Sequence, residues 1–192
     1  PLNAIVGFSD VLASGGSSEE DQRNYFRIIQ SNSDLLLRLI NDILDLSRLE
    51  ANKVILTPED CDVVQLCRQA LSSVEMSRRE SGNRFVFETK TDSFVLQTDI
   101  QRLQQVLINL LTNAAKFTKN GTITLQFEVE KEKNRVLFAV ADTGCGIPPE
   151  KQHLIFERFE KLNDFVQGSG LGLSICQLIV KYMNGKLWVD SG

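Results

Sequence analysis

The chain has 192 residues, 42% apolar and 24% charged, so it can bury a core and fits one ordinary domain plus an appendage. Its 21 Lys and Arg against 25 Asp and Glu give a net charge of −4. Without a basic cluster, this balance argues against a nonspecific nucleic-acid surface. No apolar run reaches the roughly 18 residues of a membrane span and no secretory signal is visible, so we expect no membrane contact by this segment.

The first fifty residues predict a helical hairpin. Apolar residues recur at helical spacing over 2–13, and Ser14-Gly15-Gly16 ends that helix. Ser17 and Ser18 are candidate N-caps, because acidic residues follow three positions later as in a capping box. The second helix is predicted over 19–50. Antiparallel helices usually match in length, so the missing part of the first one is expected upstream of Pro1.

The apolar stripe of the second helix is too broad for a two-helix hairpin to bury. We therefore expect two copies of the chain to pair into a four-helix bundle. The alternative is that the hairpin packs only on the domain that follows it in the same chain.

The rest of the chain, 52–192, alternates predicted strands and helices and is expected to form a second domain after the hairpin domain, 1–51. Residues 51–60 predict a linker and an edge strand, and Asp99 is a candidate cap for the helix that follows it. The other predicted helices cover 61–81, 150–156 and 171–184, and the other strands 84–88, 94–98, 122–129, 135–141 and 186–189. This order indicates an α+β two-layer sandwich.

Two amides interrupt the apolar helix after Asp99. Asn109 and Asn113 are four residues apart and therefore share one face, and Lys116 follows near the end of the helix. An amide oxygen is a suitable ligand for Mg²⁺, and a lysine ammonium for a phosphate. The alternative is that both amides simply bond to neighbouring loops.

Two glycine-rich motifs follow. Asp142 ends a predicted strand, and Gly144 and Gly146 come directly after it, where backbone can approach a ligand closely. The second motif, 168–172, leads into the last predicted helix, whose free N–H groups favour an anion. Each motif alone is weak, because the first is also a common turn and the second a possible hinge.

In this order, the three motifs resemble the ATP-binding domain of sensor histidine kinases of two-component systems. The stretch 109–116 matches the N box of that family, 142–146 and 168–172 match its two glycine boxes, and Phe156 to Phe159 matches its phenylalanine box. The sequence from Pro1 to Leu12 is similar to the one that follows the phosphoacceptor histidine. The resemblance implies a Bergerat-type ATP-binding domain after a dimerising hairpin, with ATP and Mg²⁺ as ligands.

The resemblance also implies a role for each matching residue. Asp142 would accept from the adenine amine, Asn113 would coordinate Mg²⁺ with support from Asn109, and Lys116 would bind a phosphate. The other implied nucleotide-binding residues are Gly144, Gly146, Ile147, Lys161, Gly168, Gly170, Leu171 and Gly172. Lys161 lies in the expected lid, 157–167, where the family often has arginine, and a solvated lid charge is the alternative. Cys145 occupies a variable slot of the first glycine box. The four cysteines, Cys61, Cys67, Cys145 and Cys176, are expected to be reduced thiols.

The expected activity is transfer of the γ-phosphoryl of ATP to a histidine, for relay to the receiver domain of a response regulator. The acceptor histidine is expected upstream of Pro1, and His153 is expected to be a surface residue. Related gyrase-type ATPases carry a glutamate base where this chain has Asn109, and an amide cannot take a proton. The alternatives are a degenerate kinase that docks a response regulator, or an ATPase of the wider superfamily. We expect this segment to be cytoplasmic, whether or not the parent protein is anchored in a membrane. We also expect one more strand of the domain to follow Gly192, outside this chain.

Overall fold

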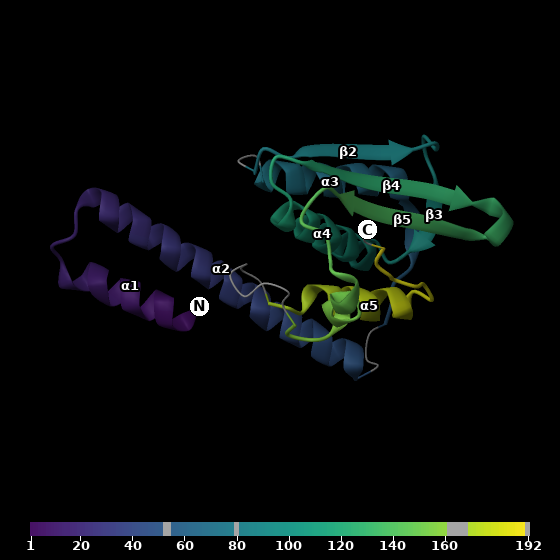
Figure 1. Cartoon of the computed structure of the whole chain (residues 1–192). Coiled ribbons are helices and arrows are strands. Elements are labelled where there is room, and N and C mark those ends of the chain that lie inside the picture. Colours follow the sequence, from purple (N-terminus) through teal and green to yellow (C-terminus); the bar gives the residue numbers. More distant parts are fainter. Residues whose placement is uncertain (52–54, 79–80, 161–168, 191–192) are drawn as a thin grey trace.

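The computed structural model describes residues 1–51, 55–78, 81–160 and 169–190, and shows a long helical hairpin beside an α/β domain (Figure 1). Helix α1, Leu2–Ser14, packs against helix α2, Glu19–Glu50. The predicted cap is confirmed: the Ser18 side chain accepts a hydrogen bond from the backbone N of Asp21 at 3.2 Å. The N-terminal half of α2 extends beyond the α/β domain together with α1.

The α/β domain has two small sheets. Strands β2 (Arg84–Thr89), β4 (Thr122–Glu130) and β5 (Arg135–Asp142) form one sheet, in which β2 is parallel and β5 antiparallel to β4. Strands β1 (Glu59–Asp62) and β3 (Val95–Thr98) form an antiparallel pair. The register places Asp142 opposite Ile123, at the end of the larger sheet.

Helices α3 (Val63–Ser77) and α4 (Ile100–Phe117) cover one face of the larger sheet, and α5 (Gly172–Tyr182) lies between α4 and α2 (Figure 1). The apolar faces of α3, α4 and the strands meet in the main core, where Leu107, Leu111 and Leu125 are almost completely buried. The predicted cap of α4 is confirmed, because the Asp99 side chain accepts from the backbone N of Arg102. This cap fixes where the amide-bearing helix begins.

A second, smaller core joins the C-terminal end of α2 to the α/β domain. Leu46 and Leu49 of α2 pack with Val106 of α4 and with residues of α5, including Ile175 and Ile179. Within the described ranges, the hairpin therefore packs on its own domain through the last turns of α2.

Several predicted elements and boundaries were wrong, including the last helix, which covers Gly172–Tyr182 rather than 171–184. Helix α3 begins at Val63 rather than residue 61, because Cys61 and Asp62 belong to β1 and the Asp62 carboxylate caps the helix; α3 ends at Ser77. The segment 150–156 forms two 3₁₀ turns, Pro149–Lys151 and Leu154–Phe156, since so short a stretch cannot offset the cost of nucleating an α-helix. Residues 186–189 form no strand, because no described strand pairs with them, and Trp188 is 55% exposed.

The expected surface position of His153 is confirmed. The cysteines also behave as expected: Cys61, Cys67 and Cys176 are buried, Cys145 is exposed, and all four are free. Burial raises the pKa of Cys67 and that of Cys176 to about 12, so neither thiol is ionised near neutral pH.

Candidate functional site

Helix α4 carries the two amides and the lysine along one side. Asn109, Asn113 and Lys116 are half-buried, while the opposite side of the helix is buried in the cores. The amide of Asn113 makes no hydrogen bond within the described part of the chain. The ammonium of Lys116 lies 5.0 Å from the centre of the Phe117 ring. A row of polar groups thus emerges from an otherwise apolar helix.

The first glycine box lies against the C-terminal end of α4. Asp142 ends β5, and its Oδ1 accepts from the Thr118 hydroxyl at 3.1 Å and from the backbone N of Gly144 at 2.8 Å. A Cβ on Gly144 would lie 2.6 Å from the Phe117 carbonyl oxygen, so this position requires glycine. The strand end and the helix end are therefore in direct contact.

The rest of this box continues over the surface. Gly146 has a φ of +67°, in the left-handed region that favours glycine. Ile147 is half-buried, and its carbonyl oxygen accepts from Nε2 of Gln152 at 3.3 Å. Thr143 is tied to β4 by two hydrogen bonds with Thr122. These contacts hold the part of the box that follows Asp142.

The second glycine box lies at the other end of the polar row. Gly170 has a φ of +72°, and a Cβ there would lie 2.8 Å from the backbone of Phe159. The backbone N of Phe159 donates to the Gly170 carbonyl at 3.0 Å, so the end of the phenylalanine box lies against this glycine. Leu171 is buried, and Gly172 begins α5.

Asn109 joins this second box to α4. A Cβ on Gly172 would lie 3.7 Å from Oδ1 of Asn109, and the Asn109 amide acts to lower the pKa of Cys176 in the next turn of α5, against the larger effect of burial. The structure thus brings Asn109 to the start of α5 and Asp142 to the end of α4. Nine residues separate Asn109 from Thr118, which corresponds to about 13 Å along the helix axis.

Two of the predicted site residues, Lys161 and Gly168, lie outside the described residues, as does most of the expected lid. Within the described part of the chain, no group of three or more His, Cys, Asp or Glu side chains could hold a metal ion. The half-buried Asn113 amide nevertheless fits Mg²⁺, because this ion commonly takes one or two protein ligands and fills its other positions with water and phosphate oxygens.

The sequence did not indicate that α2 would reach the second glycine box. Asp42 of α2 accepts a hydrogen bond from the Ser169 hydroxyl at 2.9 Å, and the same hydroxyl accepts from the backbone N of Leu171 at 3.2 Å. Desolvation raises the pKa of Asp42, while the bond from Ser169 acts in the opposite direction.

Four further polar contacts fix the C-terminal end of α2. Asp45 accepts from Arg102 at 3.2 Å and from Gln105 at 2.9 Å, both on α4. Glu50 forms an ion pair with Arg158, and the Tyr182 hydroxyl donates to the Leu49 carbonyl at 2.6 Å. No spacing rule in the sequence could have found these pairs, which join segments 50 or more residues apart.

Thr118, the residue that caps the C-terminal end of α4, also received no role from the sequence. Its hydroxyl contacts Asp142 across 24 residues of sequence. The position of Thr118 directly after the helix that carries the amides is the one sequence feature that could have indicated it.

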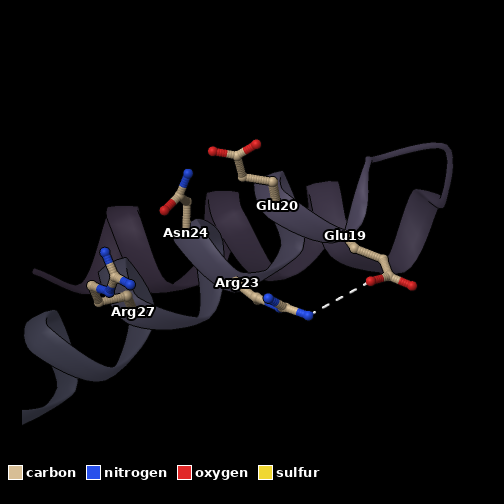
Figure 2. Close-up of a pocket in the computed structure, with 5 residues that line it drawn as sticks. All are labelled: Glu19, Glu20, Arg23, Asn24 and Arg27. Atoms are coloured by element: carbon tan, nitrogen blue, oxygen red, sulfur yellow. Dashed lines mark ion pairs between the residues drawn. The ribbon is translucent and has the colours of Figure 1, made fainter.

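Figure 2 shows an open hollow on the first turns of α2, remote from these motifs in the sequence and in the fold. Its lining is polar, and the ion pair of Glu19 with Arg23 at 3.6 Å is almost fully exposed. The lining residues are Glu19, Glu20, Arg23, Asn24 and Arg27. None of the predicted nucleotide-binding residues that the structure describes lines this hollow, which is a solvated helix surface.

The chain combines a helical hairpin with an α/β domain in which an amide-bearing helix lies between two glycine boxes. This combination defines a class of ATP-binding signalling cores. The family model described as "Histidine kinase-, DNA gyrase B-, and HSP90-like ATPase" matches residues 98–192, and the model "His Kinase A (phospho-acceptor) domain" matches residues 1–52. The chain belongs to the histidine kinase family.

Relatives and solved structures agree with this assignment. The circadian input-output histidine kinase CikA of Synechococcus elongatus is 36% identical over 200 residues, covering 100% of this chain and 26% of that protein. Hybrid signal transduction histidine kinase A of Dictyostelium discoideum is 33% identical over 205 residues, covering all of this chain and 10% of that protein. The chain thus spans about a quarter of the length of the first relative and a tenth of the second.

Among solved structures, full-length ShkA in complex with AMPPNP aligns with a TM-score of 0.75 and 31% identity, covering 100% of this chain and 41% of that one. Histidine kinase ThkA in complex with the response regulator protein TrrA aligns with a TM-score of 0.77 and 28% identity, covering 99% of this chain and 53% of that one. The catalytic domain of ThkA alone aligns over 69% of this chain and 86% of its own length, with a TM-score of 0.61 and 32% identity.

Proposed function

We propose that this chain binds Mg·ATP along helix α4 and transfers the γ-phosphoryl group to a histidine of the dimerisation helix, for relay to an aspartate of a response regulator. The observation that carries this proposal is the arrangement around α4. Its C-terminal end touches Asp142 through Thr118, and Asn109 touches Gly172 at the start of α5. One ligand extended along α4 would therefore reach both glycine boxes.

Each residue has a distinct task in this proposal. Asp142 accepts from the adenine amine, and the N–H groups at the start of α5 face the phosphates. Asn113 holds Mg²⁺, which neutralises phosphate charge when bound, and Lys116 adds a positive charge nearby. Lys161 and Gly168 remain predicted contributors from the segment outside the described residues.

Phosphoryl transfer is favoured over hydrolysis by the chemistry of Asn109. An amide cannot accept a proton from water, so this helix position supplies no general base. Positioning of the phosphates and electrostatic stabilisation would then provide most of the rate, as in other phosphoryl transfers.

The proposed partner through the hairpin is a second copy of the chain. Large apolar side chains remain exposed on both hairpin helices: Leu2, Val6, Val11, Phe26, Leu37, Ile40, Ile43 and Leu44. The described contacts with the α/β domain involve the last turns of α2, and the packing of α1 on α2 leaves these side chains exposed, so a four-helix bundle remains the best way to bury this stripe.

The other proposed partner is the receiver domain of a response regulator, as in the solved complex of ThkA with TrrA. Among the described residues, no helix combines the length and the apolar character that a membrane span requires. A cytoplasmic location of this segment stays a prediction from the family resemblance.

Calorimetric titration of the chain with ATP and Mg²⁺ tests the site. We expect binding by the unmodified chain and its loss in Asp142→Asn and in Asn113→Ala. Binding of equal strength by both variants would contradict the assigned roles. Thr124→Val, a substitution on β4 outside the motifs, is the matched control and should bind as the unmodified chain does.

A thermal unfolding assay separates a kinase from a degenerate docking module. ATP at 100 times its Kd should raise the free energy of unfolding by about 2.7 kcal/mol, because it binds the folded state alone. No stabilisation at any ATP concentration would favour the docking module. Rapid steady-state ATP hydrolysis would instead favour the superfamily ATPase.

A further inference from the structure

The two oxygens of the Asp142 carboxylate have different surroundings. Oδ1 accepts from the Thr118 hydroxyl at 3.1 Å and from the Gly144 backbone N at 2.8 Å. Within the described part of the chain, Oδ2 receives no hydrogen bond, and Asp142 is exposed. The two donors to Oδ1 set the rotation of the carboxylate and leave Oδ2 directed away from them.

Thr118 is itself held firmly. It is 1% exposed, its backbone N donates to the Ala114 carbonyl at 3.1 Å, and its own carbonyl accepts from Nδ2 of Asn83 at 2.8 Å. Oδ1 of Asn83 in turn accepts from the backbone N of Gly121 at 3.0 Å. The hydroxyl therefore occupies a fixed position between the end of α4 and the end of β5.

We propose that Thr118 is a positioning residue for adenine recognition, whose hydroxyl orients the Asp142 carboxylate so that Oδ2 accepts from the exocyclic amine of the base. This inference rests on the ATP site proposed above. A carboxylate group only accepts hydrogen bonds. A fixed Oδ2 therefore forms a hydrogen bond with a base that carries an amine donor and forms none with a purine that lacks it. Fixing the acceptor in advance also avoids an ordering cost on binding.

A purely structural role for Thr118 has a different consequence. A buried hydroxyl that only satisfies the helix end would, if lost, weaken binding of every nucleotide to a similar degree. A hydroxyl that orients Asp142 matters only for ligands that carry the amine. A pair of ligands that differ in this one group therefore distinguishes the two roles.

The experiment measures Kd by calorimetry for Mg·ATP and for the Mg²⁺ complex of purine riboside triphosphate, which lacks the exocyclic amine. The 192-residue chain is compared with Thr118→Val, which keeps the shape and removes the hydroxyl, and with Thr118→Ser, which keeps the hydroxyl. We expect Thr118→Val to weaken ATP binding about tenfold, the usual worth of a hydrogen bond to a charged acceptor. Binding of the purine analogue should not change.

Thr118→Ser should keep the preference for ATP, and Thr124→Val should leave both affinities unchanged. Equal weakening of both ligands by Thr118→Val, or no weakening of either, would overturn the inference. If Thr118→Val fails to fold, Thr118→Ala and Thr118→Ser replace it as a pair, because both lose the methyl group and only serine keeps the hydroxyl. Failure of the unmodified chain to bind either nucleotide would instead overturn the ATP site itself.

Discussion

Helix α4 buries six side chains along its 18 residues, whereas helix α2 buries two, Leu46 and Leu49, along its 32 residues. Both helices are amphipathic. The apolar face of α4 is covered by α3, α5 and the sheet of the same chain. Within the described residues, α1 and the α/β domain cover only part of the apolar face of α2, and five large side chains remain exposed: Phe26, Leu37, Ile40, Ile43 and Leu44. Helix α4 is therefore packed within one chain, while the hairpin has a surface suited to a second copy.

The largest effect should come from the core side of this comparison. Leu111→Ala in α4 removes a fully buried side chain and should lower the free energy of unfolding by about 2–5 kcal/mol, since a cavity remains. Denaturant titration measures the loss. Leu37→Ala in α2 is the matched control, because Leu37 is 60% exposed, and at high dilution it should cost far less. Equal costs at high dilution would show that α2 is buried without a partner.

The next effect should appear on the hairpin. Ile40→Glu combined with Leu44→Glu places charge on the exposed stripe and should weaken self-association at least about 100-fold, because a buried unpaired charge is costly. Sedimentation velocity measures the oligomeric state. Val95→Glu alters an equally exposed apolar residue on β3 and should leave association unchanged. A stable dimer of the double variant would place the self-contact elsewhere.

A smaller effect is expected at the polar contacts that dock α2. Asp45→Ala leaves Arg102 and Gln105 without their shared acceptor and should cost about 1–2 kcal/mol, because the group is only partly solvated. Chemical denaturation provides the measurement. Glu19→Ala removes an ion pair that is almost fully exposed and should change stability little. If the two substitutions cost the same, the docking contact contributes no more than a surface ion pair.

The smallest effect is a pH dependence at Asp42. Burial raises the pKa of Asp42 in the folded chain. The contribution of its protonated carboxyl to the free energy of unfolding is therefore fully present below the ordinary pKa of about 4, and it is lost as pH rises through the folded-state pKa. The difference in unfolding free energy between Asp42→Asn and the unmodified chain should therefore shift in favour of the variant as pH rises. Denaturation curves at several pH values measure this difference. A shift in the opposite direction would mean that the bond from Ser169 outweighs desolvation.

The sequence by itself determined the local features of this protein. The periodicity and the caps at Ser18 and Asp99 located the two long helices, because a helix start depends on residues within a few positions. The N box and the glycine boxes identified the family and the candidate nucleotide-binding residues for the same reason, since each motif is contiguous. These signals did not resolve the ends of α3 or the nature of 150–156, where short segments respond to their surroundings.

Only the tertiary structure decided which distant segments meet. It brought Ser169 to Asp42 and Thr118 to Asp142, and it left 186–189 without a partner strand among the described residues. The physical reason is that a side-chain contact between remote positions depends on how whole elements pack, and a strand exists only where a neighbour supplies its hydrogen bonds. The spacing of nearby residues determines neither the packing of whole elements nor the presence of a neighbouring strand.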